Sequence, residues 1–179
     1  KKTDSTNLDS ETLFTLLPSS YTNIHFSNDL TYSEEFNPYT YRNFYNGGGV
    51  GVGDINNDGL QDLFFCGNQV DSKLYLNKGD LKFEDITENA GLACHEVWAS
   101  GVSFVDINGD GYQDIYVCKS GKPGGKNRHN ELFINNKDNS FIESSIKYGL
   151  DNTGLSSHAA FFDYDRDGWL DLVVGNYVE

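Results

Sequence analysis

The feature that most constrains this chain is an acidic loop that occurs three times, at residues 54–62, 106–114 and 163–171. Each copy places side chains with oxygen atoms at its first, third, fifth and ninth positions, and glycine at its sixth. A hard cation such as Ca²⁺ binds through many oxygen ligands, and glycine allows the sharp turn that such a loop needs. We therefore expect about three Ca²⁺ sites.

The expected side-chain ligands are Asp54, Asn56, Asp58 and Asp62 in the first loop, Asp106, Asn108, Asp110 and Asp114 in the second, and Asp163, Asp165, Asp167 and Asp171 in the third. The backbone carbonyl of the seventh residue is expected to add one ligand to each loop, from Leu60, Tyr112 and Trp169. Asp165 stands where the other loops have asparagine, so the third loop has an additional carboxylate. We expect this loop to bind Ca²⁺ most tightly.

An EF-hand is the alternative for such loops, but its twelfth position carries a bidentate glutamate and its flanks are helices. Here the twelfth positions hold Phe65, Val117 and Val174, and the flanking residues have the pattern of strands. The aspartate at the ninth position is expected to close the site instead. Without a cation, the clustered carboxylates would repel one another by about 1 kcal/mol per pair even in water-like surroundings.

Most of the acidity of the chain lies in these loops. The formal net charge is −14, from 27 acidic and 13 basic residues; without the ten loop aspartates it is 13 − 17 = −4. Three Ca²⁺ ions would change −14 to −8. We expect no nucleic-acid binding, because recognition of phosphates requires a basic surface. No apolar run approaches the ~20 residues of a membrane-spanning helix.

The repetition continues outside the loops. The loops are offset by 52 and 57 residues, and Leu-Tyr-Leu-Asn at 74–77 recurs after 58 residues as Leu-Phe-Ile-Asn at 132–135. Short apolar or glycine-rich runs precede and follow each loop, which predicts that the loop joins two strands. Four short strands in ~55 residues are typical of one β-propeller blade. We therefore predict an all-β fold: a partial ring of about three blades, each of four short antiparallel strands.

The expected organisation has five parts: a polar tether at 1–12, an entry segment or partial blade at 13–48, a blade at 49–99, a second blade at 100–156, and the start of a third at 157–179. Because three blades cannot close a ring, we expect the chain to belong to a longer protein. The three cysteines form no CxxC motif, and small strand residues explain Cys66 and Cys118 better than a disulfide to Cys94 does.

The loop pattern Asp-x-Asn/Asp-x-Asp-Gly-x-x-Asp, followed by leucine or isoleucine, resembles the FG-GAP/VCBS repeat of integrin α-chain propellers. The segments between loops, with Leu-Tyr-Leu-Asn at 74–77 and Ala-Gly-Leu at 90–92, are more similar to proteins of the cartilage-acidic-protein type. The resemblance implies a calcium-stabilised propeller that is exported or carried on a cell surface. After the loops the chain lacks the Gly-Ala-Pro of integrins, so integrin-like ligand binding is not implied.

The resulting functional hypothesis is a non-enzymatic, extracellular or surface module that binds a protein or a glycan. One alternative is a scaffold or accessory domain of a polysaccharide-degrading enzyme, and another is a structural lipoprotein subunit of an outer-membrane assembly. Contact with a membrane is expected only through a lipid anchor or a membrane-protein partner. No catalytic residues are assigned, and we expect Trp169 to pack against the protein rather than to stack on a sugar.

Overall fold

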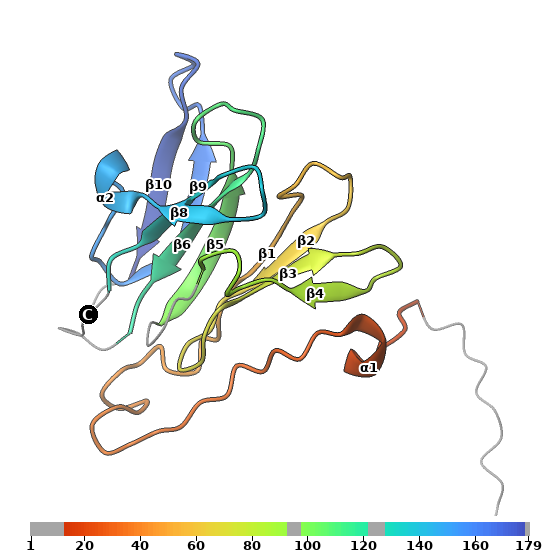
Figure 1. Ribbon diagram of the computed structural model, residues 1–179. Helices are drawn as coiled ribbons and strands as arrows, with labels where there is room; N and C mark the ends of the chain where they lie inside the picture. The colour runs from red at the N-terminus through yellow and green to blue at the C-terminus, as the bar shows by residue number, and fades with distance from the viewer. Residues whose placement is uncertain (1–12, 93–97, 122–127, 178–179) are drawn as a thin grey trace, which may run out of the picture.

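The computed structural model describes residues 13–92, 98–121 and 128–177, and these form three antiparallel sheets (Figure 1). The first sheet has the strand order β1-β2-β3-β4. Its strands are β1 (Val50–Gly53), β2 (Asp62–Phe65), β3 (Lys73–Asn77) and β4 (Phe83–Asp85). Each strand pairs with the one that follows it in sequence, so the sheet is a simple meander.

The second sheet repeats this order with β5 (Ala99–Val105), β6 (Asp114–Lys119), β7 (Glu131–Asn135) and β8 (Phe141–Glu143), followed by helix α2 (Ser145–Tyr148). The third sheet is the hairpin of β9 (Ser156–Phe162) and β10 (Asp171–Asn176). The fold expected from the sequence is thus confirmed: the protein is a partial β-propeller with four short antiparallel strands in each complete blade.

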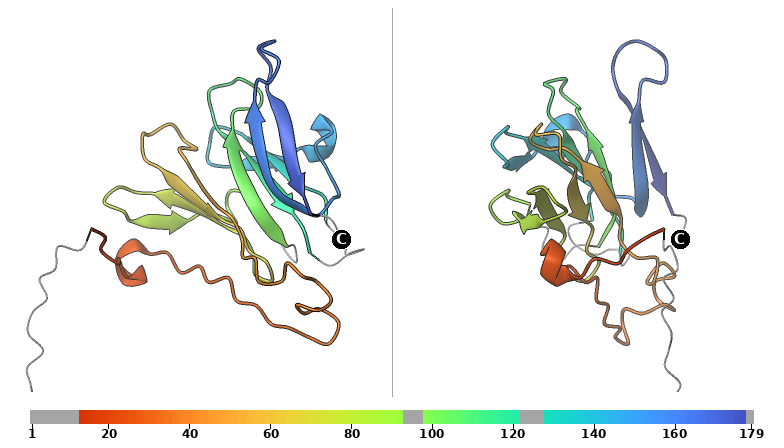
Figure 2. Two further views of the ribbon diagram at one scale, coloured as in Figure 1. Left: turned by 180° about the vertical axis from the view of Figure 1, so that it is seen from behind. Right: turned by 90° about the vertical axis from the view of Figure 1, so that its right-hand side faces the viewer.

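The three sheets lie beside one another like the blades of a fan, and β5 lies between β1 and β9 (Figures 1 and 2). Gly101 in β5 makes this close approach possible, because a Cβ atom there would lie only 2.3 Å from the carbonyl oxygen of Ser157. The hydroxyl groups of Ser100 and Ser103 donate hydrogen bonds to the carbonyls of Ser156 and Ala159, at 2.5 and 2.6 Å. Small and hydroxyl-bearing residues thus hold neighbouring blades together.

The hydrophobic core lies between the first and second blades. Its fully buried side chains include Phe64 and Leu74 from the first blade and Ile115 and Val117 from the second. Burial of a large apolar side chain of this kind contributes roughly 1.5–3 kcal/mol. Cys66 and Cys118 are buried free thiols, as expected for small strand residues, and burial raises the pKa of each to about 12.

Residues 13–49, which we call the N-terminal strap, run along the outside of the first blade towards the second (Figure 1). This segment contains the short helix α1 (Ser19–Thr22) and turns but no strand, although the sequence offered a partial blade as one interpretation of 13–48. Its backbone instead uses side chains as partners: the amide of His25 donates to the Tyr75 hydroxyl at 3.3 Å, and the carbonyl of Thr31 accepts from the Gln69 side-chain amide at 2.9 Å. The strap passes β3, β4 and the loop after β2, and its contacts there include side chains and the carbonyl of Phe83.

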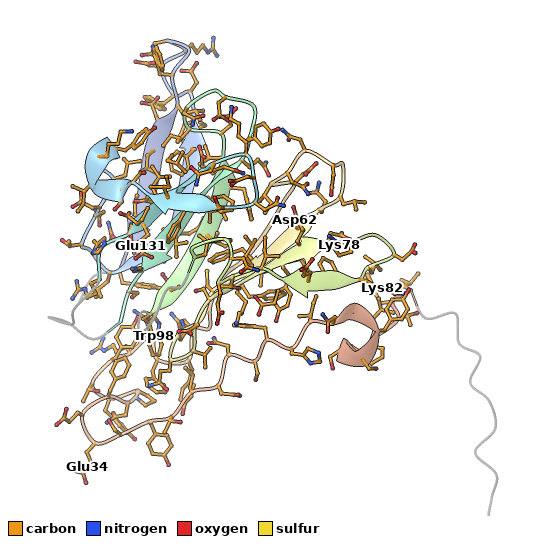
Figure 3. All side chains as sticks on the ribbon, viewed as in Figure 1. Glu34, Asp62, Lys78, Lys82, Trp98 and Glu131 are labelled. Carbon is orange, nitrogen blue, oxygen red and sulfur yellow. The ribbon has the colours of Figure 1, made fainter. Side chains whose placement is uncertain are left out.

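The strap ends on an aromatic cluster that connects it to the second blade. Trp98 precedes β5 and makes edge-on ring contacts with Phe36 and Tyr41, and Figure 3 shows it where the strap meets the blades. The Tyr41 hydroxyl is hydrogen-bonded to that of Ser120 at 2.6 Å. Burial of this phenol raises the pKa of Tyr41.

Two predictions concern residues outside the described part of the chain: the polar tether at 1–12 and the disulfide alternative for Cys94. Within the described residues, no helix is both long and apolar enough to cross a membrane.

Candidate metal centres

Each acidic loop is a hairpin loop at the same place in its blade. In the first loop, the residue before Asp54 pairs with the ninth-position aspartate, Gly53 opposite Asp62. The second and third loops have the same register, with Val105 opposite Asp114 and Phe162 opposite Asp171. The first aspartate therefore follows one strand directly and the ninth begins the next strand.

Backbone amides of the first loop donate hydrogen bonds to the side chains at its first, third and fifth positions. The amide of Asp58 donates to the Oδ1 atoms of both Asp54 and Asn56, each at 3.2 Å. The amide of Gly59 donates to the other oxygen of Asp54 at 2.8 Å, and the amide of Leu60 donates to Asp58 at 2.8 Å. The loop thus turns its side-chain oxygens towards its own interior.

The same bonds recur in the other two loops. Gly111 and Gly168 donate to the first aspartate of their loops, at 2.9 and 3.0 Å, as Gly59 does. These three glycines have φ values of 85°, 92° and 84° respectively, in the left-handed region that other residues adopt only at a cost. The glycine at the sixth position is therefore required by the backbone.

The ninth aspartate connects the loop to the rest of its blade. Asp62 is fully buried and accepts hydrogen bonds from the amides of Ile55 at 3.0 Å and Asn77 at 2.7 Å (Figure 3). Asp114 is bonded in the same way by Ile107 and Asn135, at 3.1 and 2.8 Å. One carboxylate thus joins the acidic loop to the end of the third strand of the blade.

Two asparagines that support the loops, Asn77 and Asn135, were not among the site residues predicted from the sequence. Asn77 and Asn135 end the recurring Leu-Tyr-Leu-Asn and Leu-Phe-Ile-Asn segments, so their recurrence was the available signal. Their side chains also hold the loop, because the amide groups donate to the carbonyls of Gln61 and Gln113 at 2.8 and 3.0 Å.

Without a cation, the surroundings of the ninth-position aspartates disfavour the ionised form of the carboxyl group. Burial raises the pKa of Asp62, and the carboxylates of Asp58 and Asp54 raise it further, against the lowering effect of the two amide donors. Asp114 has a raised pKa for the same reasons, with Asp110 and Asp106 as the neighbouring carboxylates. A bound cation would remove the repulsion that raises both values.

The third loop gathers its carboxylates around one point. Asp163, Asp165 and Asp171 each offer an oxygen atom, and these atoms all lie within 4.8 Å of one another. All three residues are exposed, in contrast to the buried Asp62 and Asp114. The donor sets of the three loops consist of oxygen atoms alone, which fits a hard cation such as Ca²⁺.

Two parts of the predicted ligand set stay predictions. Asp167 is not among the three convergent carboxylates; one of its oxygens accepts the amide of Trp169 at 2.8 Å. For the carbonyls of Leu60, Tyr112 and Trp169, no contact in the structure tests the predicted role. The expectation that the Trp169 side chain packs against the protein is wrong, because this side chain is 78% exposed at the tip of its loop.

The second loop has a lysine from the turn between β7 and β8 beside it. The Lys137 ammonium lies 3.3 Å from the Oδ2 atom of Asp110 and 5.2 Å from the centre of the Tyr112 ring. The pKa of Asp110 is lowered because its hydrogen bonds to Tyr112 and Lys137 outweigh desolvation. The first loop has Gly79 at the position equivalent to Lys137, so it has no such cation.

Comparison with known proteins agrees with this geometry. The FG-GAP-like repeat model matches residues 54–117 and 121–174, which include all three acidic loops. The chain belongs to the FG-GAP-like repeat family. The first matched segment begins at the first acidic loop and includes the second loop, and the second segment begins after β6 and ends within β10, so each segment extends from one blade into the next.

Individual relatives also agree with the resemblance seen in the sequence. The chain is 28% identical to integrin alpha-8 of Gallus gallus over 181 residues, covering 88% of this chain and 17% of that protein. It is 30% identical to cartilage acidic protein 1 of Xenopus tropicalis over 130 residues, covering 70% and 19%, and 29% identical to the Homo sapiens protein over 103 residues, covering 57% and 14%. The chain thus spans less than a fifth of each of these relatives.

Proposed function

We propose that this FG-GAP repeat protein is a calcium-stabilised, non-enzymatic binding module that acts outside the cell or on its surface, with another protein as its partner. The observation that carries the proposal is the threefold loop, in which backbone amides orient an all-oxygen donor set at the same place in every blade. The similarity of the chain to integrin alpha-8 and cartilage acidic protein 1 supports the proposed extracellular location and the proposal of a protein partner.

The proposed ligands are the twelve side chains at positions one, three, five and nine of the loops, with the three seventh-position carbonyls. A bound Ca²⁺ would supply positive charge that offsets the mutual repulsion of these carboxylates. The buried Asp62 and Asp114 are the residues through which this effect would reach the blade, because each also accepts an amide from the third strand. The proposed role of Ca²⁺ is therefore to stabilise the packing of the loop on its sheet.

Thermal unfolding with and without Ca²⁺ tests this role. At a hundredfold excess over Kd, each independent site adds ~2.7 kcal/mol to the free energy of unfolding, so we expect Ca²⁺ to raise Tm well above its value in EGTA. The variant Asp114→Asn should lose a large part of this increase. Asp80→Asn, which removes an exposed carboxylate outside the loops, is the matched control and should keep it. An equal Tm in Ca²⁺ and EGTA would overturn the proposed role.

The binding function is tested with purified protein on a panel of extracellular-matrix proteins and glycans, in Ca²⁺ and in EGTA. We expect saturable binding to one or more proteins that weakens in EGTA. Binding to glycans alone would contradict a protein partner, and no binding at all would contradict the binding function.

A further inference from the structure

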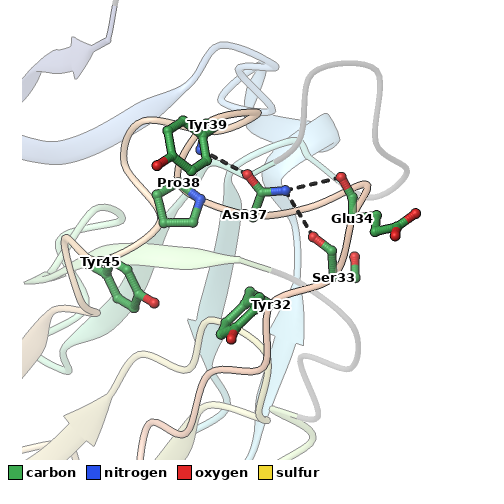
Figure 4. A pocket seen from close by; sticks show the side chains of 7 residues that line it. All are labelled: Tyr32, Ser33, Glu34, Asn37, Pro38, Tyr39 and Tyr45. Atoms are coloured by element: carbon green, nitrogen blue, oxygen red, sulfur yellow. Dashed lines mark hydrogen bonds between the residues drawn. The ribbon is translucent and has the colours of Figure 1, made fainter.

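The N-terminal strap contains a cavity of about 380 Å³ that belongs to neither the acidic loops nor the blades. We call it the tyrosine pocket. Its lining residues are Tyr32, Ser33, Glu34, Asn37, Pro38, Tyr39 and Tyr45 (Figure 4). Figure 4 shows the three tyrosine rings and the Pro38 ring around one opening. Aromatic walls of this kind are typical of ligand sites.

Internal hydrogen bonds hold the pocket in shape. The Asn37 amide group donates to the carbonyls of Ser33 and Glu34 at 2.9 and 3.0 Å. Its oxygen accepts from the amides of Tyr39 and Thr40 at 2.9 and 3.3 Å. The pocket is thus formed without a ligand, which lowers the entropy cost of binding.

The base of this segment is anchored in the protein. Tyr41 and Phe44 are buried against Trp98 and the partly buried Phe36. The tyrosines of the pocket are mostly exposed: the exposed fractions of Tyr32, Tyr39 and Tyr45 are 70%, 98% and 67%, and Tyr45 makes one edge-on ring contact with Phe44. Within the described part of the chain, no hydrogen bond is found at the hydroxyl groups of these three. Exposed aromatic rings on a segment that is anchored by a buried cluster are typical of a surface that contacts a binding partner.

We infer that the tyrosine pocket binds a proline-rich, extended segment of a partner protein that carries a basic residue beside its prolines. This inference rests on the proposed function, in which the partner is a protein. A polyproline II helix offers flat apolar rings and backbone carbonyls that have no internal hydrogen bonds. The tyrosine rings can pack against the proline rings, and the tyrosine hydroxyl groups can donate hydrogen bonds to the backbone carbonyls.

The negative charge at the rim of the pocket is the reason for proposing a basic residue in the partner segment. Glu34 lies at the rim of the pocket, and Arg42 is the only lysine or arginine in residues 13–49. The whole chain carries −14. A cationic side chain would therefore be attracted to this rim and could lie against a tyrosine ring.

A sugar fits the same surface less well. Sugars need many hydrogen-bonding groups around the stacking ring, and the one amide side chain of the pocket is already used by its own loop. Apart from the three tyrosine hydroxyls, the remaining polar side chains are Ser33, whose hydroxyl accepts the amide of Phe36 at 3.1 Å, and Glu34. A glycan is therefore an outcome of the test that counts against the inference.

The test is calorimetric titration of the protein with three synthetic peptides in Ca²⁺ buffer: a proline-rich peptide ending in arginines, the same peptide ending in glutamates, and a version with alanine in place of proline. We expect measurable binding of the first and binding at least about tenfold weaker of the other two. Equal binding of all three, or no binding of the first, would overturn the inference.

Variants locate the site. Tyr39→Ala and Tyr45→Ala should each weaken binding of the first peptide by about tenfold, and Glu34→Gln should reduce its preference over the glutamate peptide. Tyr148→Ala, at a ring in α2 away from the strap, is the control and should bind as wild type does. Because the Tyr39 ring is 98% exposed, Tyr39→Ala should leave Tm unchanged. Unchanged peptide affinity in the pocket variants would overturn the inference.

The same variants separate this inference from the proposed function. If a matrix protein on the panel binds wild type and Tyr39→Ala equally while the peptides fail, the pocket inference is wrong and the proposed function stands. If nothing on the panel binds but the arginine peptide does, the pocket is a binding site and the proposed extracellular partner is wrong.

Discussion

At the scale of single residues, Lys137 distinguishes the second acidic loop from the first. Its ammonium occupies the neighbourhood of Asp110, where a Ca²⁺ ligand is proposed. A bound Ca²⁺ would have to displace or repel this charge, so Lys137→Ala should increase the Ca²⁺ affinity of the second loop, by about twofold to fivefold given the modest strength of an exposed ion pair. The measurement is Ca²⁺ titration followed by NMR at the amide of Gly111.

Lys147→Ala, an exposed lysine in α2, is the control for this experiment and should leave the titration unchanged. A lower affinity in Lys137→Ala would show that the lysine helps the loop to fold more than it competes with the ion.

The additional carboxylate of Asp165 gives a second prediction at this scale. The third loop should have the highest Ca²⁺ affinity of the three, because Asp165 replaces a neutral amide with a charged ligand. Asp165→Asn should reduce this affinity to that of the first loop, whereas Asn56→Asp should raise the affinity of the first. Site-resolved titration in which the third loop is the weakest would contradict the prediction.

Tyr116 gives a prediction for alkaline pH. The phenol is buried, donates to the carbonyl of Leu150 at 2.9 Å and accepts from Asn130 at 3.0 Å. Burial raises the pKa of Tyr116 above its ordinary value of 10.0. The unfolded chain therefore loses this proton first as pH rises, so the stabilisation is fully present below pH 10 and is lost as pH rises through the raised value.

The free energy of unfolding should fall above pH 10 by up to about 1.4 kcal/mol per pH unit for each such tyrosine. Chemical denaturation at several pH values measures this slope. Tyr116→Phe should make it shallower, although Tyr41 contributes in the same direction. Tyr148→Phe is the control, and an unchanged slope in Tyr116→Phe would contradict the assignment.

At the scale of secondary-structure elements, equivalent strand positions differ in burial from blade to blade. The third residue of the strand after the loop is Phe64 in β2, Tyr116 in β6 and Val173 in β10. The first two are fully buried, whereas Val173 is 55% exposed. Neighbouring strands and blades cover β2 and β6, but within the described residues β10 pairs only with β9.

This difference predicts unequal effects of the same kind of substitution. Phe64→Ala should lower the free energy of unfolding by about 3–5 kcal/mol, because it leaves a cavity in the core. Val173→Ala should change it by no more than about 0.5–1 kcal/mol. Urea denaturation of both variants in Ca²⁺ buffer provides the measurement. Similar losses in the two would mean that β10 is covered in solution.

At the scale of the whole molecule, blades are held to one another by polar as well as apolar contacts. The Asn135 side chain of the second blade donates to the carbonyl of Ile55 in the first at 2.8 Å. The Asn57 side chain of the first loop donates in turn to the carbonyl of Gly111 in the second loop, also at 2.8 Å. Adjacent loops are therefore expected to stabilise each other.

Asn77 and Asn135 form a matched pair for testing this coupling. Both bond the carbonyl of the residue before the ninth aspartate, but only Asn135 also bonds a neighbouring blade. Asn135→Ala should therefore lower the free energy of unfolding by about 0.5–1.5 kcal/mol more than Asn77→Ala. Denaturation curves of the two variants give the difference. A larger loss from Asn77→Ala would show that contacts between blades are not decisive.

Most of the fold could be predicted from the sequence because the repeat is local. The spacing of aspartates within nine residues, the glycine at the sixth position and the apolar runs on either side all concern residues close together in the chain. The hairpins β1–β2, β5–β6 and β9–β10 follow from these features. The strap could not be predicted in this way, because it uses asparagine side chains and an aromatic cluster instead of a periodic pattern.

The sequence by itself determined the three hairpin loops and the positions of the oxygen-bearing side chains within them, since turn geometry and the spacing of these side chains depend on adjacent residues. Only the tertiary structure decided that Asp62 and Asp114 are buried while Asp171 is exposed, that Lys137 faces Asp110, and that three tyrosines of the strap surround one pocket. Burial and charge pairing depend on which distant segments meet, and the spacing of residues along the chain does not contain that information.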